Sequence, residues 1–127
     1  MLIENMITEW YDQGEDWRTE GISIWYMTFL FAPDGSAEMW GTGEIFVGSD
    51  PDNPAYVGKW DIIFESVLTA TDVGFDLLSY STGLGVEGVV LGYYGAWIST
   101  MNNDFSDPST FMYNTYGCIN SQVPLGD

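Results

Sequence analysis

The clearest pattern along the chain is a series of segments rich in β-branched and aromatic residues, separated by turn-forming sequences. Residues 22–31 are the densest of these segments, and the sequence Pro-Asp-Gly-Ser at 33–36 separates them from residues 37–47, so the two segments predict a β-hairpin. Further strands are predicted at 56–68, 73–80 and 110–119, and the glycine-rich residues 81–97 predict two more that meet near Gly92. The order predicts a chain of consecutive antiparallel strands.

The first of these strands is apolar on both faces. Ile22, Ile24, Tyr26 and Leu30 alternate with Trp25, Met27, Phe29 and Phe31. An antiparallel sheet with one face in water shows a polar residue at every second position. We therefore expect a helix or another subunit to cover the second face.

The N-terminal residues 1–20 carry a different pattern. Apolar residues at Ile3, Met6, Ile7, Trp10 and Tyr11 follow the spacing of an amphipathic helix, and six acidic residues are interspersed among them. A short N-terminal helix ending near Gly14 is one interpretation. The alternative is an irregular acidic lead-in that Trp10 and Trp17 anchor. At the other end, residues 120–127 are predicted to be a tail.

Together these elements predict a mostly β protein of one domain over residues 1–127. The size is that of one ordinary domain with a hydrophobic core of its own. We expect a small antiparallel β-barrel of about seven to eight strands, with the N-terminal helix as an optional addition. Because the predicted strands are apolar on both faces, we also expect a homo-oligomer.

The charge of the chain excludes several functions. Nineteen Asp and Glu residues stand against Arg18 and Lys59 alone, which gives a net charge of −17, and histidine is absent. Such a surface repels phosphate backbones and anionic lipid, so neither nucleic acid nor a membrane is an expected partner. Self-repulsion at this density is best tolerated at high ionic strength, which favours a salt-adapted or marine bacterial source.

The termini and the single cysteine bear on location. Cys118 has no partner for an intramolecular disulfide, and the acidic N-terminus lacks the basic region of a signal peptide. The longest apolar run, at residues 89–98, is too short to cross a bilayer as a helix. If Met1 is the natural start, we expect a soluble, cytoplasmic protein.

A glycine motif needs interpretation before cofactors can be considered. Gly83, Gly85 and Gly88 match the letters of the dinucleotide-binding fingerprint G-x-G-x-x-G. That fingerprint requires a following helix, whereas the sequence after Gly88 is rich in Val, Tyr and Gly and poor in helix formers. Gly58-Lys59 also fails as a phosphate loop, because Trp60 follows it. The motif therefore predicts a glycine-bent strand, and no cofactor is expected.

Metal binding and catalysis have few candidate residues. The acidic loops at 50–53 and 102–107 offer oxygen ligands for calcium, but solvated turns explain them better, so no metal is expected. Without histidine, acid–base chemistry falls to carboxylates and tyrosines. Glu65 and Glu87 are the candidate catalytic residues, because apolar strand residues surround each in sequence and burial would raise a carboxyl pKa.

Three segments resemble a known group of barrels. The segments are Trp40-Gly41-Thr42-Gly43, the run from Gly58 to Glu65, and the glycine stretch from Gly83 to Leu91. Their order over residues 37–101 resembles that of allene oxide cyclase-like and dirigent-like proteins. The resemblance implies an eight-stranded, often oligomeric barrel whose interior binds an apolar substrate. It would place Glu65 and Glu87 at or near the cavity, although no catalytic motif of those families is present residue for residue.

The function that the sequence favours is a pocket for a small apolar or aromatic molecule. Six aromatic residues within the predicted strands are the candidate ligand-binding residues: Tyr26, Trp40, Trp60, Phe64, Tyr80 and Trp97. Two alternatives stay open. A cofactor-free cyclase or isomerase would use a carboxylate in the cavity, and a non-catalytic, oligomeric interaction protein would have an interior filled by its own side chains.

Overall fold

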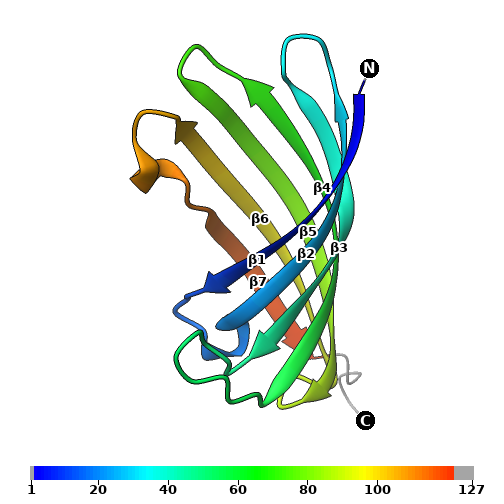
Figure 1. Ribbon diagram of the computed structural model, residues 1–127. Coiled ribbons are helices and arrows are strands. Elements are labelled where there is room, and N and C mark those ends of the chain that lie inside the picture. The colour runs from blue at the N-terminus through cyan, green and yellow to red at the C-terminus, as the bar shows by residue number, and fades with distance from the viewer. Residues whose placement is uncertain (1, 122–127) are drawn as a thin grey trace.

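The computed structural model describes residues 2–121 as one sheet of seven antiparallel strands with two short 3-10 helices (Figure 1). The strands are β1 (Leu2–Asp12), β2 (Gly21–Phe31), β3 (Ala37–Val47), β4 (Gly58–Ala70), β5 (Gly74–Gly88), β6 (Tyr93–Asp104) and β7 (Asn114–Ser121). The helices are η1 (Trp17–Thr19) and η2 (Pro108–Thr110). Each strand pairs with the next one in the chain, which confirms the predicted mostly β, antiparallel architecture.

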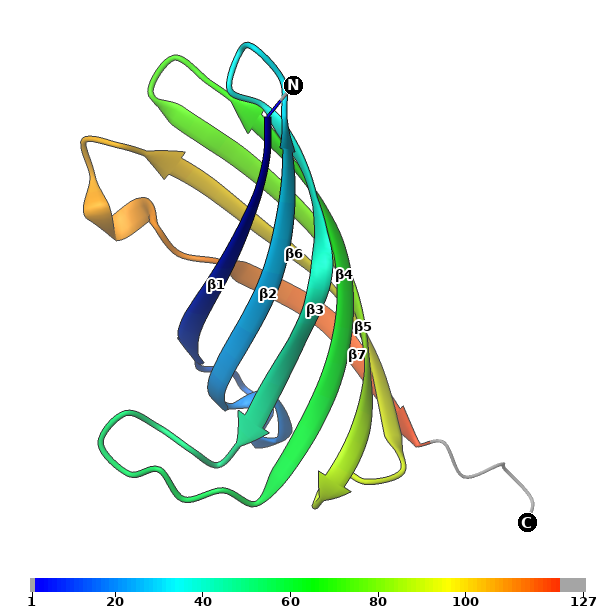
Figure 2. The same cartoon turned by 45° about the vertical axis from the view of Figure 1, so that its right-hand side comes forward.

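The strands are long, and the sheet is strongly curved, so it has a concave and a convex face (Figure 2). In this view β1 to β4 pass in front of the concave space, and β5 to β7 lie behind it. A bulge between Lys59 and Trp60 shifts the register of β4 against β5, and such bulges increase local bending. The hydrogen-bonded ladders run from β1 to β7 without joining these two, so the described sheet is open at its edges.

The N-terminal segment corrects both interpretations of residues 1–20. Residues 2–12 are neither helical nor irregular but form β1, which pairs with β2 from Leu2 opposite Phe31 to Asp12 opposite Gly21. The apolar spacing that suggests a helix also fits an edge strand with apolar side chains on both faces. Pairing with the long β2 decides between a helix and a strand, because it satisfies the backbone polar groups along one side of β1, and those on the other side face solvent at the sheet edge.

Two other boundaries differ from those predicted. Residues 73–80 and the first half of the glycine stretch are one continuous strand, β5, which ends at Gly88. The turn at 89–92 lies where the sequence predicts two strands to meet. The last strand begins at Asn114 and includes residues 120 and 121 of the predicted tail. The rest of that tail, residues 122–127, lies outside the described residues.

The core lies on the concave face in two parts. The first core cluster consists of Met27, Phe29, Ala37, Met39, Leu77 and Met101. The second core cluster consists of Ile45, Val47, Trp60, Ile62 and Val90. Every strand from β2 to β6 contributes to one of them, so the concave side is the interior of the molecule.

The convex face carries a row of uncharged side chains that crosses the whole sheet. The row runs through the paired residues Ile7, Tyr26, Thr42, Ile63, Thr82, Ala96 and Cys118. Ile7 and Ile63 are among the most exposed apolar residues of the chain. No helix within residues 2–121 covers this face, so the helical cover allowed by the sequence is wrong for this part of the chain. That part also contains no helix long and apolar enough to cross a membrane.

Candidate functional site

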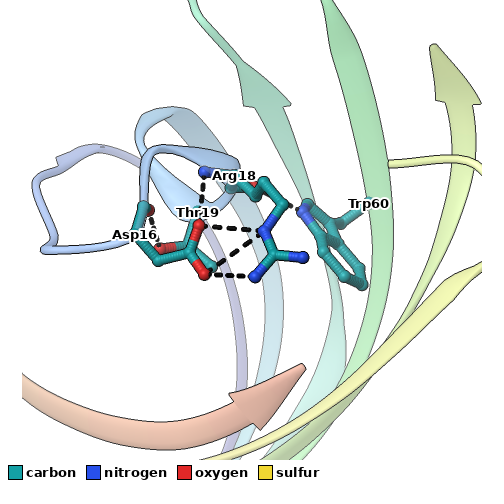
Figure 3. Close-up of polar contacts among 4 residues, drawn as sticks. All are labelled: Asp16, Arg18, Thr19 and Trp60. Atoms are coloured by element: carbon teal, nitrogen blue, oxygen red, sulfur yellow. Dashed lines mark hydrogen bonds and ion pairs between the residues drawn. The ribbon is translucent and has the colours of Figure 1, made fainter. Parts of the chain in front are cut away.

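One end of the concave space is closed by the segment that links β1 to β2 (Figure 3). The Trp60 side chain is fully buried, and its Nε1–H donates a hydrogen bond of 2.8 Å to the carbonyl oxygen of Arg18. Asp16 caps η1 by accepting from the Arg18 backbone N–H, and its Oδ2 lies 2.6 Å from Nη2 of Arg18. The Arg18 guanidinium also lies over the ring of Tyr93, 5.1 Å from its centroid.

These contacts have an electrostatic consequence for Asp16. Hydrogen bonding from Arg18 lowers the pKa of the Asp16 carboxyl, so the pair stays charged at neutral pH. The arrangement satisfies the indole N–H, the guanidinium and the carboxylate within the chain. We therefore regard this end of the interior as structural.

The glycine motif belongs to the same packing. The Trp97 ring meets the Trp60 ring edge-on at a centroid distance of 5.4 Å, and it lies against Gly95 and Gly117, where an added Cβ would come within 2.3 Å of the ring. At Gly85 a Cβ would be 1.8 Å from the carbonyl oxygen of Val90. After Gly88 the chain turns into β6 rather than a helix. The geometry accounts for the glycines by close packing, in agreement with the bent-strand interpretation.

A second part of the interior is hollow and polar. A cavity of about 80 Å³ is bounded by side chains from the strands and from the segment before β7. Its lining residues are Thr8, Trp10, Asp12, Trp25, Met27, Met39, Phe64, Ser66, Ser79, Ser81, Ser99, Tyr113 and Thr115. Trp10, Trp25 and Phe64 supply aromatic surface, whereas hydroxyl groups gather on β4 to β7.

The hydroxyl groups form a row across four neighbouring strands. Ser66 pairs with Ser79, Ser79 with Ser99, and Ser99 with Thr115 in the sheet register, so all four side chains stand on the concave face. Ser66 Oγ donates to Ser79 Oγ at 2.7 Å, and the Ser99 and Thr115 hydroxyl oxygens are 2.8 Å apart. This hydroxyl row can both donate and accept hydrogen bonds.

Asp12 supplies the only carboxylate among the cavity-lining residues. Burial raises the pKa of the Asp12 carboxyl above its usual range, and a hydrogen bond with the Ser23 side chain offsets this in part. The Asp12 Oδ2 atom is buried and has no hydrogen-bond partner within residues 2–121. Oδ1 of Asn103 is also buried without a partner, but it belongs to a neutral amide, and a buried carboxylate oxygen without a partner is the more costly of the two.

Aromatic contacts link β1 to the segment that precedes β7 at the opposite edge of the sheet. The Trp10 ring lies 4.9 Å from the Tyr113 ring in an edge-on arrangement and 5.2 Å from the Phe111 ring, centroid to centroid. Burial, together with the negative charge of Asp12, raises the pKa of the Tyr113 hydroxyl to about 12. Tyr113 therefore stays neutral and presents a hydrogen-bond donor at physiological pH.

Solvent reaches the concave face between the unpaired edges β1 and β7. Met6 stands on the concave face of β1, opposite Met27, and is 45% exposed. On β7, Thr115 and Gly117 are exposed as well. The concave face is therefore accessible to solvent near Met6 and along β7.

The structure divides the predicted site residues between the two faces. Trp60, Phe64 and Trp97 lie on the concave face, and of these Phe64 alone lines the cavity. Tyr26, Trp40 and Tyr80 lie on the convex face and are exposed, as is Glu65. Glu87, at the end of β5, is also exposed and accepts a hydrogen bond from the Tyr56 hydroxyl. The eight residues are therefore not brought together in one place.

Four of those residues border a larger, open groove on the convex side. Phe64, Glu65, Tyr80 and Trp97 take part in its lining, and it encloses about 530 Å³. The small residues Thr82, Ala96 and Cys118 stand side by side along it, and the longer side chains of Tyr80, Ile98 and Tyr116 form the next row of the sheet. The groove is mainly apolar, and unlike the cavity it contains no buried, unpaired polar atom.

Sequence reasoning missed Asp12, Tyr113 and the hydroxyl row. Asp12 lies in residues 1–20, which the sequence analysis interprets as a helix or an acidic lead-in. Nothing in the sequence distinguishes this carboxylate from the other five acidic residues of that segment. The serines were visible as alternate positions, Ser79 and Ser81, within a strand otherwise rich in apolar residues. Polar residues at every second position of such a strand indicate a polar site on one face, and this signal can be recognised once the buried face is known.

Comparison with known proteins adds no relative to this description. A scan against protein-family models, a search of curated proteins and a search of solved structures each found no match. The resemblance to allene oxide cyclase-like and dirigent-like barrels is therefore neither supported nor contradicted by them. The chemistry of the cavity itself carries the functional argument.

Proposed function

We propose that this protein binds a small, mainly apolar or aromatic molecule in the cavity beside Asp12. The observation that carries the proposal is the buried Oδ2 of Asp12, which has no partner in the described residues, in a cavity that Trp10 on β1 and Tyr113 before β7 both line. Pockets for small ligands combine apolar walls with a few convergent polar groups, and those groups often have shifted pKa values. Trp10, Trp25 and Phe64 provide the walls, and Asp12, Tyr113 and the hydroxyl row provide the polar groups.

In this proposal the curved sheet acts as an incomplete barrel. The wall is interrupted between β1 and β7, where Trp10 and Tyr113 already bring the two edges into contact. The barrel of the sequence prediction, and of the family it resembles, would be the ligand-bound form in which these edges close further. The volume of about 80 Å³ limits the enclosed part of the ligand to a small group; for comparison, an engineered apolar cavity of roughly 150 Å³ binds benzene.

The binding test uses NMR spectra of the tryptophan indole N–H groups while small aromatic and aliphatic compounds are added. Trp10 donates its indole N–H to Thr8 and Trp25 donates to Ser23, both at the cavity, whereas Trp60 donates to the Arg18 backbone in the closed end. We expect a bound compound to shift the Trp10 and Trp25 signals and to leave the Trp60 signal in place.

A pair of variants controls for the location of binding. Ser99→Leu adds bulk to the cavity wall, whereas Thr100→Leu makes a similar change at the next residue, on the convex face. We expect Ser99→Leu to abolish binding and Thr100→Leu to preserve it. Binding that survives Ser99→Leu, or that shifts none of the indole signals, would place the ligand elsewhere and refute the proposal.

The convex face favours a second function, self-association. The uncharged row from Ile7 to Cys118 crosses all seven strands of a chain whose net charge is −17. An interface between two copies requires a band of surface without charged side chains, and this row is such a band. We expect a homo-oligomer in sedimentation at physiological salt, and Ile63→Glu to dissociate it. A monomer at all accessible concentrations would exclude this second function.

A further inference from the structure

The interior carboxylate has no cation of its own in this chain. The sequence contains only two basic side chains, Arg18 and Lys59. Arg18 is paired with Asp16, and Lys59 lies 2.7 Å from Glu44 and 3.3 Å from Asp61. Neither reaches Asp12, whose buried Oδ2 has no partner in the described part of the chain. When this carboxyl is ionised, neither basic side chain of the protein balances its charge, so a cation that does so would come from outside.

On this basis, we infer that the cavity selects small organic ammonium ions, with the ammonium group on Asp12 and the carbon chain against the aromatic walls. The inference rests on the proposed function and names its ligand class. A carboxylate accepts hydrogen bonds only, and an ammonium group supplies three donors. The Asp12 oxygen and hydroxyl oxygens of the row provide acceptors for them.

The aromatic surroundings favour an organic cation over a metal ion. Trp10 and Tyr113, which lie against each other at the cavity, offer ring faces that attract an ammonium group within about 6 Å. Calcium takes roughly six to eight oxygen ligands, often from more than one carboxylate, and Asp12 is the only carboxylate among the cavity-lining residues. No cluster of three or more potential metal-ligating side chains occurs among the residues for which the structure accounts.

The electrostatic field of the whole protein also favours a cationic ligand. A net charge of −17 raises the local concentration of cations and lowers that of anions. The overall charge and the single buried carboxylate therefore favour the same class of ligand.

The experiment compares three probes of nearly equal size at pH 7 and constant ionic strength. These probes are propylammonium, 1-propanol and propionate, and the readout is the shift of the Trp10 and Trp25 indole signals. We expect propylammonium to bind at least about tenfold more tightly than 1-propanol, a difference of about 1.4 kcal/mol. Propionate should show no binding.

Two variants in β1 test whether the preference for propylammonium comes from Asp12. Asp12→Asn removes the charge from the cavity, and Glu9→Gln removes one charge from an exposed position of β1. We expect Asp12→Asn to lose the preference for propylammonium and Glu9→Gln to keep it. If the wild-type protein binds 1-propanol as tightly as propylammonium, the ammonium inference is overturned while the proposed pocket stands. If none of a wider panel of neutral and charged compounds binds, both fail.

Discussion

Two regions of the concave face treat their buried polar groups differently. Around Trp60, the indole N–H, the Arg18 guanidinium and the Asp16 carboxylate have partners within the chain, and the glycines allow two tryptophans to pack edge to face. In the cavity that Asp12 lines, hydroxyl groups surround a hollow and one carboxylate oxygen is left without a partner in the described residues. The comparison indicates that the first region stabilises the fold, whereas the second contains groups left available for a ligand.

The largest effect that this comparison predicts is at Trp60. Trp60→Ala should destabilise the protein by roughly 3–5 kcal/mol, because a large, fully buried side chain leaves a cavity behind. The matched change Trp40→Ala, on the convex face where the side chain is 44% exposed, should cost less than about 1 kcal/mol. Urea unfolding of both variants measures the difference. Equal losses would show that the concave face is not the main core.

The next effect concerns Gly85, in the closed region. Gly85→Ala should cost about 1–3 kcal/mol, because the new Cβ collides with the carbonyl oxygen of Val90 and the turn into β6 has to move. Thermal unfolding followed by circular dichroism measures this loss. A variant as stable as the wild type would mean that the glycine motif is not needed for packing, and would reopen its interpretation as a binding sequence.

At the cavity we expect one substitution, Asp12→Asn, to stabilise the folded protein. Burial raises the pKa of Asp12 above its unfolded-state value, so its destabilising contribution grows as the pH rises from the unfolded-state pKa to the folded-state pKa. Below the unfolded-state pKa the carboxyl is neutral in both states and this penalty vanishes. The stability of Asp12→Asn relative to wild type should therefore increase between pH 3 and pH 7. An unchanged difference in urea midpoints over this range would contradict a buried, unpaired Asp12.

The smallest effect is expected at Glu65, which the sequence singles out as a catalytic candidate. Its side chain is exposed on the convex face, so Glu65→Gln should change stability by less than about 0.5 kcal/mol. It should also leave binding in the cavity unchanged in the indole NMR experiment. Loss of cavity binding in this variant would show that the convex groove, not the cavity, takes the ligand.

The sequence is sufficient to predict the strands whose signals are local, meaning a β-forming segment bounded by a turn sequence. Residues 22–31 and 37–47 have dense β-forming sequences around a clear turn, and the structure forms β2 and β3 within one residue of those limits. The N-terminal strand was missed because its apolar spacing fits a helix equally well. Only pairing with β2, a non-local interaction, settles the choice.

The candidate site was much harder to predict. Tyr80 and Ser79 lie on opposite faces of β5, so only one of them points inward. The sequence does not show which face is buried, because both faces carry apolar residues. Glu65 and Glu87 have apolar neighbours in sequence but point outward or lie at a strand end. The hydroxyl row becomes visible only when the register sets Ser66, Ser79 and Ser99 side by side.

Titration of the Asp12 side-chain carboxyl carbon by NMR tests the distinction between the two regions most directly. We expect this carboxyl to titrate above the usual aspartate range in the free protein, because it is buried and one of its oxygens has no partner. Saturation with propylammonium should lower that pKa, since the cation favours the charged carboxylate. A pKa within or below the usual range in the free protein, unchanged by propylammonium, would contradict both the strained carboxylate and its assigned ligand.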